Sequence, residues 1–382
     1  MKRKILYITG TRADYGLMVS VLKSIKKHPD LDLSLIVTGM HLMENYGMTV
    51  DEIKGDDFHF ITIPAVYDSS DASVIHFMAS FLNKLGDVLI KNRPDIILIA
   101  GDRAEALAAA ITASYMSIPL AHISGGDISS TVDEHIRHAI TKLAHIHFPY
   151  TEKSAERIMR MGEDPWRVHI IGAPGLDDII KKTSFDKKSI AEKYHLDLSK
   201  PVALLLQHSV THEIEDAPQQ IEMALQVLVD MKIQTIVIYP NADLGGSAMI
   251  EKIKEFEHFH QIHAYKSIPR CDFLNLLKVA SVMIGNSSSG IIEAASFKLP
   301  VINIGTRQNG RERGLNVVDT KYDKESIRTI LEFILNNPTF MDSLTGIVNP
   351  YGDGNTGEKI AEILSKVIID KKLLQKQLNY KI

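Results

Sequence analysis

Short, uninterrupted apolar runs alternate with longer amphipathic stretches along this chain, and this alternation constrains its fold more than any other feature. The runs are rich in Ile, Leu and Val and are flanked by turn residues, which is typical of strands buried on both faces. Amphipathic helical patterns lie between them, at 17–26, 74–91 and 104–115. A repeated strand–helix order predicts parallel sheets covered by helices on both faces. The predicted strands are 5–8, 33–37, 96–100, 120–123, 146–148, 202–206, 235–239, 282–284 and 301–304.

The length of 382 residues exceeds what one hydrophobic core usually serves, so we expect two domains. The strand–helix rhythm breaks between 173 and 200, where a Gly-Ala-Pro-Gly stretch precedes a charged region, and then restarts. We therefore predict an α/β protein with a Rossmann-like domain at 1–175 and a second, nucleotide-binding one at 176–355. The remainder, 356–382, contains a helical pattern that we expect to pack back on the first domain.

Composition excludes several functional classes. The net charge is −4, and no basic block stands out beyond a modest lysine-rich tail, so we expect no nucleic-acid partner. Cys271 is the single cysteine, which rules out an intrachain disulfide and suits a reducing compartment. The apolar run at 5–8 is too short for a signal peptide, and we find no apolar stretch of spanning length. The sequence predicts a cytoplasmic protein without a membrane partner.

Polar clusters follow the predicted strands, where ligands bind in open parallel sheets. Small and hydroxyl residues at 286–290 let backbone N–H groups approach a diphosphate, although the same residues also favour a helix N-cap. Arg12 and Arg103 add guanidinium donors suited to phosphate, or to structural ion pairs. The Gly-Thr-Arg start at 10–12 lacks the Gly-x-Gly-x-x-Gly spacing, so we expect no redox cofactor. The clusters are 10–14, 101–105, 122–127, 207–211, 285–290 and 305–308.

Two histidine pairs could suggest a metal. His135 and His138 are three residues apart, and His145 and His147 alternate on a predicted strand. The sequence has no His-Glu-x-x-His signature and no cysteine beside them. We interpret these histidines as structural or hydrogen-bonding groups and expect no metal.

Five motifs follow one another along the chain: Gly-Thr-Arg-Ala-Asp-Tyr at 10–15, Gly-Asp-Arg at 101–103, Asp-Glu-His-Ile-Arg-His-Ala-Ile-Thr-Lys at 133–142, Gly-Asn-Ser-Ser-Ser-Gly at 285–290 and Gly-Thr-Arg-Gln at 305–308. In this order, along about residues 5–355, the chain resembles the hydrolysing UDP-N-acetylglucosamine 2-epimerases. This resemblance implies the B-type glycosyltransferase fold, with two Rossmann-like domains facing across a cleft.

The reaction that the resemblance implies converts UDP-N-acetylglucosamine and water to N-acetylmannosamine and UDP, by anti elimination to a glycal followed by hydration. It needs no cofactor, and its partners are the UDP-sugar and further copies of the chain, as a homodimer or homotetramer. Several alternatives remain open. They are the same reaction on UDP-N,N'-diacetylbacillosamine in legionaminic acid synthesis or on a GDP-linked sugar, a B-type glycosyltransferase, and a catalytically inactive sugar-nucleotide-binding protein.

The resemblance also implies roles for individual residues. Proton removal at C2 and delivery to its other face need two acid/base groups, and Asp102 and Asp133 resemble the carboxylates of the family. Positive charge and oriented dipoles must stabilise the departing diphosphate. Glu293, expected on the first turn of its helix, would accept the ribose hydroxyls. His208 is both a nucleotide ligand and a catalytic candidate. The residues expected to bind the substrate are Arg12, Arg103, Asn241, Asn286, Ser287, Ser288, Glu293 and Arg307.

Two positions depart from the family pattern. Many members read His-Ile-Glu-Gly-Gly-Glu, where this chain has Ser124 in place of the first glutamate and Asp127 in place of the second. The role of that glutamate either moves to Asp127 or is covered by Asp102 and Asp133. The stretch 208–212 reads His-Ser-Val-Thr-His instead of His-Pro-Val-Thr-Thr, a change that could tune the sugar pocket.

Overall fold

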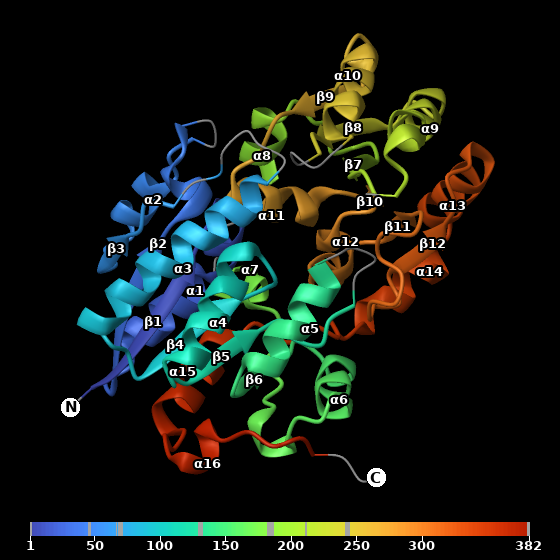
Figure 1. Ribbon diagram of the computed structural model, residues 1–382. Coiled ribbons are helices and arrows are strands. Elements are labelled where there is room, and N and C mark those ends of the chain that lie inside the picture. Colours follow the sequence, from blue (N-terminus) through green and yellow to red (C-terminus); the bar gives the residue numbers. More distant parts are fainter. Residues whose placement is uncertain are drawn as a thin grey trace. The chain divides into compact units, whose positions relative to one another are not determined.

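A computed structural model describes residues 2–44, 47–65, 67, 72–128, 133–181, 187–210, 212–240 and 245–379. Contacts divide the chain into two compact units (Figure 1). The first comprises the described residues of 2–180 together with 351–379, and the second those of 181–350.

The first unit is built on a six-stranded parallel sheet with the order β3-β2-β1-β4-β5-β6. Its strands are β1 (Arg3–Thr9), β2 (Leu31–Val37), β3 (Phe60–Thr62), β4 (Ile96–Ala100), β5 (Leu120–Ile123) and β6 (Ile146–Phe148). Its helices are α1 (Arg12–Lys27), α2 (Val50–Gly55), α3 (Ser73–Lys91), α4 (Ala104–Tyr115), α5 (Asp133–Leu143), α6 (Glu152–Arg160), α7 (Asp177–Lys181), α15 (Thr356–Lys366) and α16 (Lys371–Leu374).

Alternate residues of β1 enter two different cores. Ile5 and Tyr7 pack with residues of α1 and α15 on one face of the sheet, whereas Leu6 and Ile8 pack with residues of α3 and α4 on the other. A strand covered on both faces must be apolar at every position, because side chains alternate between the faces. This burial explains why residues 5–8 of β1 form an uninterrupted apolar run.

Helix α3 is long and apolar enough, by length and composition alone, to cross a membrane. Its Phe77, Phe81, Leu85 and Leu89 are fully buried against the sheet of the first unit. The expectation that no stretch reaches spanning length is thus wrong for this helix. Its buried stripe gives the apolar composition a role in the core.

The second unit repeats the same plan with the order β12-β11-β10-β7-β8-β9, again parallel throughout. In both sheets the strand order is that of the Rossmann fold, so the predicted fold class is confirmed. Its strands are β7 (Val202–Leu206), β8 (Gln234–Ile238), β9 (Ile262–Tyr265), β10 (Val282–Gly285), β11 (Val301–Ile304) and β12 (Val317–Thr320). Its helices are α8 (Lys187–Lys193), α9 (Ala217–Asp230), α10 (Gly246–Phe256), α11 (Arg270–Val279), α12 (Ser288–Ile292), α13 (Lys324–Asn336) and α14 (Pro338–Ser343).

The C-terminal part of the chain returns to the first unit, where α15 lies beside α1 (Figure 1). The close approach depends on Gly357, because a Cβ there would lie 2.6 Å from Ser24 Oγ and 3.0 Å from Val21 Cα. Asp177 accepts hydrogen bonds from the backbone N–H groups of Thr356 and Gly357, at 2.9 and 2.8 Å. A carboxylate at this position satisfies the unpaired donors at the start of α15.

Candidate active site

Each sheet has one point where its strand order reverses, between β1 and β4 in the first unit and between β7 and β10 in the second. Loops that leave neighbouring strands in opposite directions open a crevice there, at the carboxyl ends of the strands, and ligands bind in it. The segments 10–14 and 101–105 follow β1 and β4, and the segments 207–210 and 285–290 lie at the ends of β7 and β10. Four of the six predicted polar clusters therefore lie at the two switch points, whereas the clusters 122–127 and 305–308 follow β5 and β11.

Asp102, directly after β4, is held by a guanidinium from α5. Arg137 Nε donates to Asp102 Oδ2 at 2.8 Å, and Nη2 makes a second contact with the same oxygen. The third nitrogen, Nη1, donates to the carbonyl oxygen of Asp127 at 2.7 Å. Arg137 is buried, so these charge-assisted bonds stabilise the carboxylate form of Asp102. The fold thus gathers two catalytic candidates around one arginine that was not among the predicted site residues.

His122 supports the turn that carries Asp102. This histidine is fully buried, and its Nε2 lies 2.8 Å from the carbonyl oxygen of Gly101, to which it donates. Gly101 has a φ of +74°, a left-handed conformation that favours glycine. The fixed turn determines where the Asp102 carboxylate projects from the end of β4.

Asp127 and Ser124 lie in the loop after β5. Asp127 is buried, and its Oδ1 accepts a hydrogen bond from Ser154 Oγ of α6 at 2.7 Å. The preceding Gly126 has a φ of +78°, and a Cβ there would lie 2.1 Å from the Ser154 carbonyl oxygen. Ser124 is also left-handed, with a φ of +67°. The loop is therefore tightly constrained against α6, and Ser124 occupies a strained position that is unusual for serine.

Asp133 lies in the first turn of α5, one helical turn before Arg137, and is exposed. A carboxylate there interacts favourably with the positive end of the helix. Asp133 and Asp127 thus differ sharply in their surroundings, one exposed on a helix and the other buried in a loop.

The two arginines expected to bind phosphate have different environments. Arg103 Nε donates to Glu105 Oε1 at 2.7 Å, and the Glu105 side chain is almost fully buried. Glu105 packs directly on Gly10, where a Cβ would lie 2.1 Å from Glu105 Oε1. Arg12 is largely exposed and pairs with Glu52 at 2.9 Å. Arg103 is therefore fixed at the switch point, whereas Arg12 lies on the surface in an ion pair with a residue of α2.

A row of hydrogen-bonded side chains at the end of β1 was not predicted from the sequence. Thr9 Oγ1 donates to Asp14 and lies 3.0 Å from His41 Nε2, while His41 Nδ1 lies 2.7 Å from Thr49 Oγ1. Because Thr9 donates to Asp14, His41 Nε2 must be the protonated nitrogen. Burial, and then the nearby Glu105, raise the pKa of Asp14 to about 7. The only sequence signal for this row of side chains was the place of Asp14 in the motif at 10–15.

In the second unit, Asn286 joins the two strands of the switch point. Its Oδ1 accepts from the backbone N–H of His208 at 2.7 Å, and its Nδ2 donates to the His208 carbonyl at 2.8 Å. The carbonyl of Asn286 in turn accepts from Arg307 Nη1 at 3.2 Å and Gln308 Nε2 at 2.8 Å. The Asn286 side chain thus positions His208 and is itself fully buried.

The serine segment begins a very short helix. Ser287 is the N-cap of α12, and its Oγ accepts from the backbone N–H of Ser289 at 3.4 Å. Ser288, the first residue of α12, is partly exposed. The sequence of this segment suits both a helix N-cap and a phosphate site, and the capping geometry is present. Asn241, also expected to bind the nucleotide, lies outside the described residues.

The expected position of Glu293 is wrong. Instead of lying on the first turn of its helix, it is the C-cap residue of α12, because that helix ends at Ile292. Its buried side chain forms an ion pair with Arg270 of α11. A ribose at Glu293 would therefore meet a carboxylate already held by a cation.

Buried histidines give the first unit a pH dependence. Burial lowers the pKa of His41 and of His147 to about 4 and that of His122 to about 3. Between about pH 6.5 and 4 the unfolded chain binds protons that the folded chain does not. The unfolding free energy therefore decreases as the pH is lowered through this range. Asp14, whose pKa is raised, opposes this trend, but it is one group against several histidines.

We expect the urea concentration at the midpoint of unfolding to decrease when the pH is lowered from 7 to about 4.5, and to decrease less in His41→Gln. A constant midpoint would contradict this assignment.

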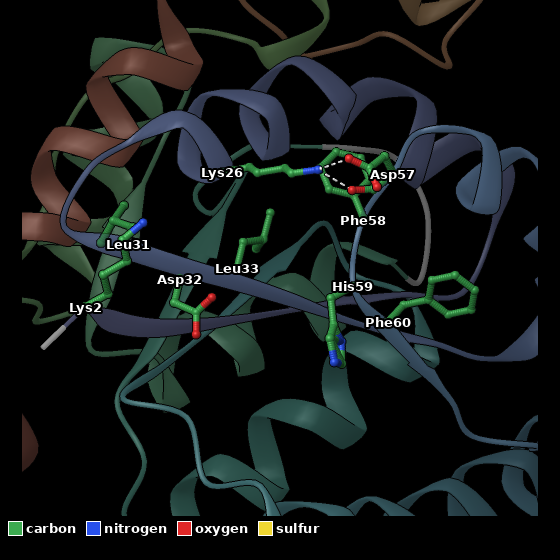
Figure 2. Close-up of a pocket in the computed structure, with 9 residues that line it drawn as sticks. All are labelled: Lys2, Lys26, Leu31, Asp32, Leu33, Asp57, Phe58, His59 and Phe60. Atoms are coloured by element: carbon green, nitrogen blue, oxygen red, sulfur yellow. Dashed lines mark hydrogen bonds and ion pairs between the residues drawn. The ribbon is translucent and has the colours of Figure 1, made fainter.

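A pocket of about 600 Å³ lies at the opposite end of the first sheet (Figure 2). It is lined by residues at the amino ends of β1, β2 and β3, including Leu31, Leu33 and Phe60. Lys26 reaches across it to the Asp57 carboxylate at 2.9 Å. None of its lining residues is a candidate site residue. Ligands of open parallel sheets bind at the carboxyl ends of the strands, whereas this pocket lies at their amino ends.

The two six-stranded parallel sheets, each with its switch point, define the B-type glycosyltransferase fold, with two Rossmann-like units. The sequence matches the model of the UDP-N-acetylglucosamine 2-epimerase family over residues 23–365, and the chain belongs to this family. It is 42% identical to the UDP-N,N'-diacetylbacillosamine 2-epimerase (hydrolyzing) of Legionella pneumophila, over 98% of this chain and 99% of that protein.

A UDP-N-acetylglucosamine 2-epimerase of Neisseria meningitidis serogroup B is 36% identical, over 95% of each chain. Among solved structures, UDP-GlcNAc 2-epimerase from Neisseria meningitidis bound to UDP-GlcNAc has a TM-score of 0.82 and 19% identity, covering 95% of this chain and 100% of that one. This last likeness shows the fold.

Proposed function

We propose that this protein is a hydrolysing 2-epimerase of a UDP-linked 2-acetamido sugar, and that UDP-N,N'-diacetylbacillosamine is its substrate. The observation that carries the proposal is the 42% identity to the Legionella relative, which extends over nearly the full length of both chains. The second candidate substrate, UDP-N-acetylglucosamine, is favoured by the relative of 36% identity.

In the proposed reaction Asp102 removes the proton from C2 while the C1–O bond to UDP breaks, which leaves a glycal and free UDP. Water then adds to C1, and C2 receives a proton on the opposite face, so the products are the 2-epimeric free sugar and UDP. Asp102 is the candidate for this step because it follows β4 at the switch point and the Arg137 contacts fix the direction of its carboxylate. Asp127 and Asp133 are the candidates for the second proton transfer.

Positive groups at the switch points suit the departing diphosphate. Arg103 follows β4, and Arg307 is tied to the carbonyl of Asn286 at 3.2 Å. We propose that the Arg307 guanidinium, with the hydroxyls of Ser287 and Ser288 in the same unit, interacts with the phosphates. Preorganised donors of this kind stabilise charge that develops as the leaving group departs.

The test is incubation of the purified protein with each sugar nucleotide in D₂O, followed by NMR. We expect UDP, a free 2-epimerised sugar and deuterium at C2, with a higher kcat/KM for UDP-N,N'-diacetylbacillosamine than for UDP-N-acetylglucosamine. A product that keeps UDP attached would indicate a non-hydrolysing epimerase. UDP release that requires an acceptor would indicate a glycosyltransferase, and no turnover of either compound would contradict the proposal.

A further inference from the structure

A lysine near the C-terminus is almost buried at the end of α5. The Lys376 side chain is 15% exposed, and its Nζ donates to the carbonyl oxygens of Ala144, Lys142 and Thr141 at 2.6, 3.0 and 3.3 Å. Thr141 and Lys142 belong to the last turn of α5, whose carbonyls have no partner within the helix. The ammonium thus occupies the negative end of this helix, supplied by a segment 232 to 235 residues further along the chain.

Charged groups from several elements fix this ammonium. Glu163, after α6, contacts Lys376 Nζ at 2.6 Å, Lys142 Nζ at 2.6 Å and His147 Nε2 at 3.1 Å. Burial lowers the pKa of Lys376 to about 8, and Glu163 opposes that shift, so the lysine is charged at neutral pH. Burial lowers the pKa of His147 to about 4, so Glu163 and the two lysines carry the charge of this cluster.

The chain on both sides of Lys376 is also held by the first unit. Arg167 donates to the carbonyl oxygens of Leu373 and Lys372 at 2.9 and 2.7 Å. On the other side, the backbone N–H of Asn379 donates to the Gly162 carbonyl at 2.8 Å. Lys376 is therefore delivered to α5 by a segment with its own fixed position.

The same helix end connects directly to the catalytic candidates. Thr141 is fully buried, and its hydroxyl donates to the carbonyl oxygen of Arg137 at 3.1 Å, while its own carbonyl accepts from Lys376. One turn further back, Arg137 holds Asp102. A shift of α5 along its axis would move the guanidinium relative to Asp102, which projects from the end of β4.

We propose that Lys376 is a positioning residue for catalysis: by binding the C-terminal carbonyls of α5, it fixes the placement of Arg137 against Asp102. The inference rests on the proposed function, since it assumes that this pair takes part in the reaction. Lys376 does not contact the pair itself and acts through the helix.

The test compares Lys376→Met with Lys376→Arg and with a control, Lys372→Met. Lys372 lies in the same segment, but its side chain packs over the Trp166 ring at 4.8 Å. We expect Lys376→Met to lower kcat about tenfold with KM changed less than about twofold, because misplaced groups affect the transition state more than ground-state binding. Lys376→Arg should restore most of kcat, and Lys372→Met should match the wild type. Hydrogen exchange should accelerate in the last turn of α5 in Lys376→Met only.

Two results would overturn the inference: a folded Lys376→Met with normal kcat, or an equal loss in Lys372→Met. If Lys376→Met does not fold, Lys376→Gln, which keeps a neutral donor, provides the same comparison. Should the wild type turn over neither sugar nucleotide, the proposed function fails on its own, and hydrogen exchange still tests the anchoring. Unchanged exchange in α5 would then reject it.

Discussion

Asp102→Asn is expected to lower the turnover number about a hundredfold or more, while UDP affinity stays within about twofold of the wild type. The amide cannot accept the C2 proton, but its oxygen still accepts a hydrogen bond from Arg137, so the local geometry survives. The change therefore removes the base without removing the contacts that hold the turn after β4. Steady-state kinetics and calorimetric titration with UDP measure the two quantities separately.

Variants of the neighbouring loop and helix complete this experiment. Ser124→Ala should cost far less turnover, because a neutral hydroxyl is a poor proton acceptor near neutral pH. Asp127→Asn and Asp133→Asn assign the second proton transfer, since the larger loss identifies the residue that takes part. Normal turnover in Asp102→Asn would reject the proposed mechanism, whatever the other variants do.

Gly285→Ala is expected to lower the unfolding free energy by about 3 kcal/mol or more, and to weaken UDP binding as well. Gly285 ends β10 with a φ of +122°, and a Cβ there would lie 2.0 Å from the carbonyl oxygen of Leu206 on β7. Both the backbone conformation and the contact exclude a side chain. To relieve this clash, β10 would have to move away from β7. That movement would also break the hydrogen bonds between Asn286 and the His208 backbone.

Gly346→Ala is the matched control in the same unit, because a Cβ at this glycine meets no atom within 4 Å and its φ is not positive. Urea unfolding should separate the two variants clearly, with Gly346→Ala close to the wild type. Equal stability of the two variants would show that β10 tolerates displacement from β7 and that the switch point is not rigid.

The central strands of both sheets could be predicted from the sequence alone. Within β1, β4, β7 and β10 the runs 5–8, 96–99, 202–206 and 282–284 are buried, so every position in them is apolar, and each run stands out without any knowledge of the neighbouring strands. The polar clusters at their carboxyl ends were equally visible, because turn residues and polar side chains interrupt the apolar pattern there.

Three strands were not predicted: β3, β9 and β12, and all of them are edge strands. Their residues are mostly half-buried or exposed, and each strand mixes polar with apolar side chains. An edge strand has a neighbour on one side only, so the pairing that defines it comes from the adjacent strand and leaves little trace in its own sequence.

The tertiary structure alone decided which partners the site residues have. Asp102 and Arg137 are 35 residues apart, and Asn286 and His208 are 78 apart. Residue type marked Asp102 and Asn286 as site candidates, but could not show that one is held by a buried guanidinium or that the other joins two strands. Lys376 reads in the sequence as part of a lysine-rich tail, and only the fold brings it to the end of α5. Local sequence determines burial and secondary structure through side-chain periodicity, whereas contacts between distant segments depend on how the sheets and helices pack.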